Sequence, residues 1–218
     1  MMRKESIRRV LLGGALLLAS VAGAFLAVPA GLARHLAPRP SLVARSWQIH
    51  FQHSAPRRLI VLRGKGAAQH VIKYWFMTYT VVNNTHKDLF FNPQVELMAD
   101  NGKIIAPVAA VAPRLFKKIK AVSASPFLIN PMLIAGRLLQ GADNAKQSVV
   151  VFTSLPPTAR GFRVFVSGLS GETAVQKDPV TDKNIVLHKT LVLHYWIPGH
   201  AIHMTPRPML LSHKWVMK

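Results

Sequence analysis

The sequence lacks cysteine entirely and contains only eight Asp and Glu residues among its 218. Without cysteine, disulfide bonds, thiol catalysis and thiolate metal sites are all excluded. So few acidic residues also leave few pairs of carboxylates for acid–base chemistry. The stability of the folded chain must therefore come from packing, and few catalytic classes are open to it.

The common catalytic patterns are missing as well. Glu96 and Asp100 form a close carboxylate couple in an expected hairpin, but strand geometry places them about 13 Å apart, beyond the separations that glycosidases use. Gly168–Gly171 is one glycine spacing short of a nucleophile elbow, and no apolar helix follows it. Gly64–Gly66 lacks the rest of a phosphate-binding loop. We therefore expect a protein that is not an enzyme and uses no cofactor.

Basic residues are abundant, because 28 Lys and Arg give the chain a formal net charge of +20 and a pI of about 11.4. Such an excess attracts polyanions, for example acidic envelope polysaccharide or lipid head groups. The cations are spread along the chain without a run of five or six, which equally fits a solvated basic surface. Specific nucleic-acid binding is not expected, because the N-terminus directs the chain out of the cytoplasm.

The N-terminus carries an export segment. The run Val10–Ala33 has no charged side chain and follows a basic head of Arg3, Lys4, Arg8 and Arg9. It predicts either a signal peptide, cut after Ala24 or Ala33, or an uncleaved anchor helix in which Val10–Val28 spans the membrane. The paired arginines also partly match a twin-arginine signal. Each alternative places the rest of the chain in the periplasm or beyond, secreted or anchored to the membrane.

The rest of the chain predicts a linker and one all-β domain. After the export segment at residues 1–33, residues 34–44 contain two prolines and predict an extended linker. Residues 45–218 suffice for one domain, and their short β-branched runs predict an antiparallel β-sandwich. The expected strands are Arg45–Gln52, Arg57–Leu62, Val71–Val82, Gln94–Ala99, Ile104–Val108, Met132–Leu139, Ser148–Leu155, Gly161–Ser167, Asn184–Trp196 and Met209–Val216. Val71–Val82 is apolar on both faces, which is typical of a central strand, and Met209–Val216 is expected at an edge.

Two local patterns add detail. Asn101 and Gly102 lie between apolar runs and predict a type I′ hairpin turn. Apolar residues at helical spacing, opposite three lysines, predict a short amphipathic helix at Pro113–Val122. These apolar residues are Leu115, Phe116, Ile119 and Val122. We expect the helix to cover one end of the sandwich; the alternative is that it lies on an anionic surface.

Several segments carry a resemblance to known proteins. Val81–Thr85, Asp100–Gly102 and Gly161–Val166, in this order, resemble exported bacterial immunoglobulin-like β-sandwich domains. Gly168–Glu172, Tyr195–Gly199 and Lys214–Lys218 are similar to a group of envelope proteins from planctomycete-like bacteria, although His200 stands where that group has an acidic residue. The resemblance implies an immunoglobulin-like fold for about Arg45–Lys218 and carries no assigned activity or site residue.

Histidines are the remaining candidates for a site. His194, His200 and His203 lie near an expected turn at Pro198–Gly199, and imidazoles so placed can bind zinc or copper. No acidic residue is close enough in sequence to orient their rings, so the alternative is a set of surface histidines on an edge hairpin.

Together these patterns favour a non-enzymatic binding or structural module of the cell envelope. Its expected partners are the membrane, through the N-terminal helix if that is uncleaved, and a protein or an anionic envelope polymer. One alternative is a periplasmic metal-binding domain that uses the C-terminal histidines. Another is an accessory subunit of a membrane complex that docks through the N-terminal segment.

Overall fold

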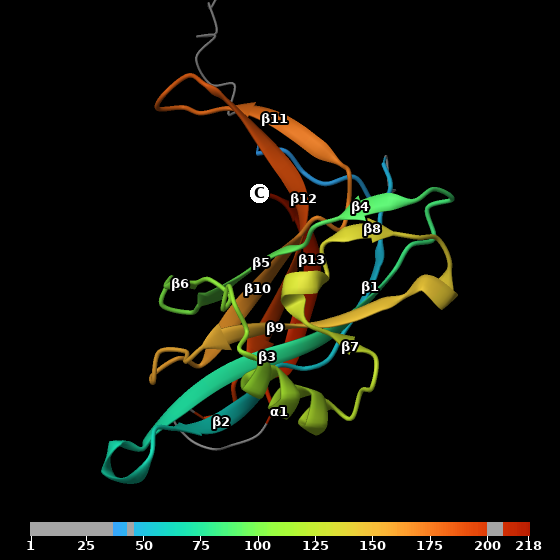
Figure 1. Cartoon of the computed structure of the whole chain (residues 1–218). Coiled ribbons are helices and arrows are strands. Elements are labelled where there is room, and N and C mark those ends of the chain that lie inside the picture. Colours follow the sequence, from blue (N-terminus) through green and yellow to red (C-terminus); the bar gives the residue numbers. More distant parts are fainter. Residues whose placement is uncertain (1–36, 43–45, 200–206) are drawn as a thin grey trace, which may run out of the picture. The chain divides into compact units, whose positions relative to one another are not determined.

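A computed structural model describes residues 37–42, 46–199 and 207–218. Most elements in these residues are β-strands, arranged in several largely antiparallel sheets (Figure 1). The first sheet contains β1 (His50–His53), β2 (Arg57–Arg63), β3 (His70–Val82), β7 (Leu128–Ile129) and β9 (Lys146–Thr153). The second contains β5 (Gln94–Ala99), β6 (Ile104–Ile105), β10 (Gly161–Ser167), β11 (Thr173–Lys177), β12 (Asn184–Trp196) and β13 (Met209–Met217). A small third sheet pairs β4 (Leu89–Phe91) with β8 (Gly136–Leu138). The all-β class predicted from the sequence is confirmed.

The main core lies between the first and second sheets. Alternate residues of β3, including Trp75, Met77 and Tyr79, belong to the same buried cluster as Phe162 of β10 and Leu193 of β12. The rings of Trp75 and Phe162 lie 6.0 Å apart across this layer. Each such side chain contributes roughly 1.5–3 kcal/mol by leaving water. This alternation joins the two sheets around one core.

β3 is the central strand of the first sheet, as predicted. It pairs with β1 and β2 on one side and with β9 on the other. Its residue Phe76 points away from the main core into a second buried cluster with Val149 and Val151 of β9. Because β3 is covered on both faces, it needs apolar residues at successive positions.

The second cluster is closed by the helix α1 (Pro113–Ser123), which starts at Pro113 as predicted. Its residues Leu115 and Ile119 are buried against the outer face of the first sheet. The prediction that the helix covers one end of a sandwich was therefore wrong, because a sheet face and not an end receives it. Ala124 follows in the left-handed conformation (φ 50°) and ends the helix.

Two local predictions were also wrong. Gly102 has a positive φ of 82° but Asn101 does not, so the hairpin turn is not type I′. The amide of Gly102 instead donates to the Ala99 carbonyl, and a glycine in this conformation completes a three-residue loop with a bulge. The segment Met132–Leu139 forms only the strand β8, because Pro131 starts a 3-10 turn capped by the side chain of Asn130.

Short elements complete the chain. Within the part of the chain that the structure describes, 3-10 helices lie at η1 (Gly66–Ala68), η2 (Pro131–Leu133) and η3 (Ala142–Asn144). The strand β7 runs parallel to β9, unlike the antiparallel pairing predicted throughout. The strand β11, which was not predicted, pairs with the first half of β12.

The predicted export segment Val10–Ala33 lies outside the described residues. Among the helices that the structure does describe, none is both long and apolar enough to cross a membrane.

Candidate functional site

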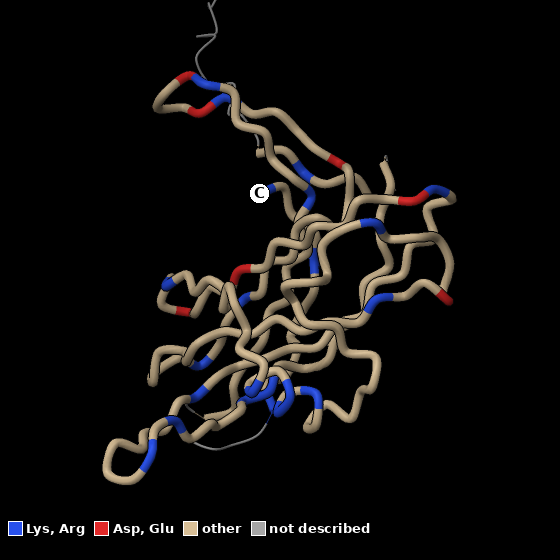
Figure 2. Tube along the Cα trace, in the orientation of Figure 1, with Lys and Arg blue, Asp and Glu red and all other residues tan. Residues whose placement is uncertain are grey.

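Charge is unevenly divided over the domain. No Asp or Glu occurs in residues 46–87 or 101–142, which contain β1, β2, β3, α1 and β7. In Figure 2, α1 and the β2–β3 hairpin carry blue Lys and Arg positions and no red ones, and the Asp and Glu positions lie elsewhere. The positive potential of a surface is stronger where no acidic side chain lies nearby to offset its cations.

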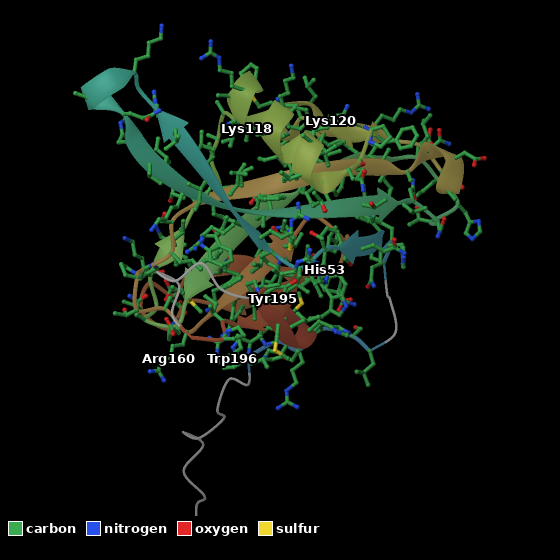
Figure 3. The ribbon with its side chains drawn as sticks, turned by 90° about the horizontal axis from the view of Figure 1, so that it is seen from below. His53, Lys118, Lys120, Arg160, Tyr195 and Trp196 are labelled. Atoms are coloured by element: carbon green, nitrogen blue, oxygen red, sulfur yellow. The ribbon has the colours of Figure 1, made fainter. Side chains whose placement is uncertain are left out.

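The helix α1 contributes the centre of this surface. Leu115 and Ile119 are buried, whereas Arg114, Lys117 and Lys118 are exposed. At 3.6 residues per turn Lys117 lies opposite the buried pair, and Arg114 and Lys118 lie to one side of it. Lys120 is half-buried and lies in the last turn, where a cation is favoured by the helix dipole. Figure 3 shows Lys118 and Lys120 on the far side of the first sheet from His53 and Tyr195.

The strand β2 adds arginines beside the helix. Leu59 and Val61 pack into the cluster under α1, so Arg57 and Arg63 share the face that looks toward the helix. The guanidinium of Arg57 lies 5.1 Å from the centre of the Phe76 ring and donates a hydrogen bond to the carbonyl of Val122. Arg57 thus joins the C-terminal end of α1 to the sheet.

We call the six cations of α1 and β2 described above the basic face: Arg57, Arg63, Arg114, Lys117, Lys118 and Lys120. The ion pairs found among the described residues use Arg137, Lys177, Lys189 and Lys218 and none of the six. An open hollow of about 370 Å³ lies between Lys117, Lys120 and the loop at residues 124–126. The basic face can therefore take up anionic groups without first breaking an acidic contact.

Of the three histidines in the predicted metal site, the structure describes only His194. His194 lies on β12, opposite Arg163 of β10, and is half-buried. His200 and His203 lie outside the described residues, so the prediction of a three-histidine metal site stays a prediction. In the described ranges no group of three or more His, Asp or Glu side chains is arranged to hold a metal ion.

A different histidine takes part in a contact that the sequence did not indicate. The phenol oxygen of Tyr195 lies 3.0 Å from Nδ1 of His53, so the two sheets meet through a polar contact at the edge strand β1. Burial lowers the pKa of His53, helped by the nearby His213, while the hydrogen bond to the Ser54 carbonyl opposes the shift. Burial also raises the pKa of Tyr195 well above its usual value. Both shifts favour the neutral forms, which suits a structural hydrogen bond better than proton transfer.

This contact borders a cleft between the edge strands β1 and β13. The cleft has a volume of about 280 Å³, and its lining includes His50, Phe51, His53, His213 and Trp215. It combines aromatic and imidazole side chains, and none of the described residues in its lining carries a carboxylate. Its chemistry therefore offers stacking and hydrogen bonding and no acid–base pair of the usual kind.

A buried ion pair holds the beginning of the domain. Nζ of Lys189 lies 3.0 Å from Oε2 of Glu172 and 5.3 Å from the centre of the Trp215 ring. The backbone N–H of Ser41 donates to Oε1 of Glu172 at 2.7 Å, and the Ser41 carbonyl accepts from Lys189 at 3.2 Å. These contacts, first that of Ser41 and then that of Lys189, lower the pKa of Glu172. We call Ser41, Glu172, Lys189 and Trp215 the entry clamp.

Neither the clamp nor the Tyr195 contact was predicted. Both join residues more than a hundred positions apart or on different strands, and no spacing rule in one sequence connects them. A weak signal was available for the clamp, because Lys189 falls on the same strand face as the buried Leu191 and Leu193. A lysine in such a position needs an acidic partner.

Comparisons with known proteins add little. No protein-family model matches the chain, and no curated protein matches it significantly. Among solved structures, the yjhA protein from Bacillus subtilis aligns with a TM-score of 0.37 and 10% sequence identity. That alignment covers 65% of this chain and 92% of the yjhA chain. The function must be argued from the residues of the chain itself.

Proposed function

We propose that the protein is an exported, non-enzymatic module of the cell envelope that binds an anionic partner through the basic face. The single observation that carries this proposal is the clustering of six cations on α1 and β2, in chain segments without any acidic residue. A formal charge of +20 spread evenly would give only weak attraction at any point. Concentrated on one face, the same kind of charge binds a polyanion and releases its counterions.

The helix is well suited to present these cations. It is fixed from below by Leu115 and Ile119 and at its C-terminal end by Arg57, so its lysines sit on a rigid support. A partner that binds a rigid surface does not have to order it first, which leaves more of the contact energy for affinity.

The wider context is also part of the proposal. Export rests on the uncharged run Val10–Ala33 behind a basic head, which serves as either a signal peptide or a membrane anchor. An immunoglobulin-like sandwich fits the sharing of one core by the first and second sheets. Modules of that architecture commonly act by contact.

A non-enzymatic role is supported by the causes of the shifted pKa values. The shifts of His53, Tyr195 and Glu172 accompany the structural contacts described above. Tyr79 has its pKa raised to about 12 by burial in the core. Asp178 has its pKa lowered by bonds from Thr181 and Val180 within one turn. Packing explains the shift of Tyr79 and a turn explains that of Asp178, and His53, although it lines the cleft between β1 and β13, has no carboxylate among the described lining residues to act with it.

Salt-dependent binding of an anionic polymer tests the proposal. The full chain, purified in a nonionic detergent, is titrated with fluorescent dextran sulfate at several salt concentrations. The test variant replaces Lys117, Lys118 and Lys120 with Gln. We expect its affinity to fall. The magnitude of the slope of log K against log salt should decrease by roughly 2–3, because fewer counterions are released on binding when three lysine contacts are lost.

A matched variant controls for net charge. Lys87, Lys103 and Lys183 are exposed and lie outside the basic face, so replacing them with Gln removes the same number of charges from another part of the surface. The control variant should keep nearly the affinity of the unmodified chain. Equal losses in both variants would show a response to total charge alone and would refute a dedicated face.

A further inference from the structure

The hairpin of β11 and the first half of β12, residues 173–188, extends beyond the core of the domain, and we call it the arm. In Figure 1 it projects from the upper part of the domain, away from α1 and β2. Its apolar side chains are exposed, with 63% of Val175, 54% of Val186 and 44% of Ile185 open to solvent. Apolar side chains gathered on a projecting ribbon indicate a surface for contact with another molecule.

One side of the arm is a free strand edge. Among the described residues, β11 pairs with β12 alone and lies at the end of the second sheet. The amide of Asp178 donates to the carbonyl of Lys183, and the amide of Lys189 donates to the carbonyl of Glu172. These two bonds fix the phase of the ladder, because hydrogen-bonded pairs alternate with pairs that exchange no hydrogen bond.

The phase decides which backbone groups of β11 are free. Its even-numbered residues bond to β12, in step with the bonds at positions 172 and 178. The odd-numbered residues Thr173, Val175 and Lys177 therefore direct their N–H and C=O groups away from β12. Such a row of donors and acceptors is a template for one more strand.

The other long edges of the described sheets are protected against such pairing, and that of β11 is not. The pairing of β13 is interrupted by a bulge at Tyr195, and this strand also carries Lys214. The strand β2 begins with Arg57 and Arg58, while β6 and β7 contain only two residues each. Bulges, charged residues and short length all discourage edge pairing. In contrast, β11 pairs over five residues without a register shift and has one charged residue, at its end.

Charge on the arm favours a second copy of the chain as the partner. Two molecules of formal charge +20 repel each other, most strongly where cations are concentrated. The arm contains two lysines, Lys177 and Lys183, and two aspartates, Asp178 and Asp182, so its charges sum to zero. Figure 2 shows both colours at this hairpin. Two copies can approach here without bringing their excess cations together.

We propose that two copies of the chain associate through the arm, with their β11 strands paired antiparallel about a twofold axis at Val175. This register places Thr173 of each copy opposite Lys177 of the other, so all three outward-facing residues form hydrogen bonds. Val186 lies opposite Val175 within one copy, so the dimer forms a row of four valines on one sheet face. The basic face takes no part, so the inference is independent of the proposed function.

The interface is small, and the dimer exchanges with monomer. A strand pair of five residues buries less surface than the roughly 1,200–2,000 Å² of stable complexes. An introduced cysteine can trap such a dimer as a disulfide, since the natural chain has no cysteine. Residues of a hydrogen-bonded antiparallel pair have Cα atoms about 5.5 Å apart, which a disulfide can bridge.

The test uses the full chain in a nonionic detergent, carrying either Val175→Cys or Val186→Cys. Both valines are exposed on the same face of the arm, so Val186→Cys is a matched control. In the dimer the two copies of Val186 are three strand spacings apart, about 14 Å, too far for a disulfide. Under mild oxidation we expect Val175→Cys to form the disulfide dimer at least tenfold faster. Rates within about twofold of each other would show random collision and would overturn the proposal.

The register is tested by mixing two further variants. Thr173→Cys chains and Lys177→Cys chains should crosslink to each other at least about fivefold faster than either does to itself, because only the mixed pair lies opposite across the twofold axis. Crosslinking without this preference would refute the antiparallel strand pairing.

Salt distinguishes direct pairing from bridging by a polyanion bound to two basic faces. Raising the salt from about 0.05 M to about 0.5 M screens the repulsion between the copies, so the excess of Val175→Cys over Val186→Cys crosslinking should persist or grow. Loss of this excess at high salt would indicate a bridging polyanion and would overturn the proposal. Dextran sulfate binding should weaken over the same range, so the two proposals are tested separately.

Discussion

Lys189 and Glu172 form an ion pair with 3.0 Å between Nζ and Oε2, and the lysine side chain is only 2% exposed. Removal of the acid leaves a buried ammonium without its partner, which is far costlier than loss of an exposed pair. We expect Glu172→Ala to lower the Tm by roughly 10 °C, whereas Lys177→Ala, which breaks the exposed pair with Asp182, should lower it by about 2 °C at most. Calorimetry of both variants checks this contrast, and similar shifts would contradict it.

The same carboxylate makes stability depend on acid pH. The pKa of Glu172 is lowered from its usual 4.5 by the Ser41 amide and by Lys189, so the folded chain holds this proton less tightly than the unfolded chain. Its stabilising effect is therefore complete above pH 4.5 and is lost as the pH falls through the folded pKa. Chemical denaturation between pH 6 and 3 should show a smaller acid loss for Glu172→Gln, and parallel curves would refute this.

His53 should govern stability in a higher pH window. Burial lowers its pKa from 6.5, so the unfolded chain binds a proton that the folded chain does not. The free energy of unfolding should then fall as the pH drops below 6.5 toward the folded pKa, and level off beneath it. Replacing His53 with Phe, beside Phe51 and Tyr195, should flatten this part of the profile. An unchanged slope in denaturation curves would show that other groups cause it.

The motif that ends β3 has a structural role. Asn83 is fully buried, and its side chain donates to the carbonyls of Lys87 and Leu138 and accepts from the Thr85 amide. Asn83→Ala would remove these hydrogen bonds, including the buried one to the Leu138 carbonyl, and should cost about 2–4 kcal/mol. The exposed neighbour gives a matched control, since Asn84→Ala should change stability by about 0.5 kcal/mol or less. Urea denaturation distinguishes them, and equal effects would refute the role of Asn83.

Local pattern predicted much of this fold. β-branched and aromatic runs located β2, β3, β10 and β12 within a residue or so, because side-chain burial and strand propensity agree there. Pro113 and the spacing of Leu115 and Ile119 located the helix for the same reason. Where one short segment contained conflicting signals, as between Asn130 and Gly136, the predicted strand was mostly absent.

The candidate sites depended on contacts that no local pattern contains. The cations of α1 and β2 were visible one by one, but their grouping needs Leu59 and Leu115 to meet in the second cluster. The clamp joins Ser41 to Glu172, and the cleft joins His53 to His213, and in each case the two segments are distant in sequence. Only the folded arrangement of the two sheets brings these residues together.

The helix layer should open separately from the main core. Ile119 is fully buried, but its neighbours Phe76 and Val151 belong to the second cluster, apart from the residues that join the two sheets. Ile119→Ala should cost about 2–5 kcal/mol, whereas Val122→Ala, at a side chain 46% exposed, should cost about 0.5 kcal/mol or less. Hydrogen exchange should show faster exchange of the α1 amides in Ile119→Ala while the amides of β10 stay protected, since local units open below the global unfolding free energy. Equal loss of protection in both elements would mean that helix and sheets unfold as one unit, and that the basic face is not carried by a separable layer.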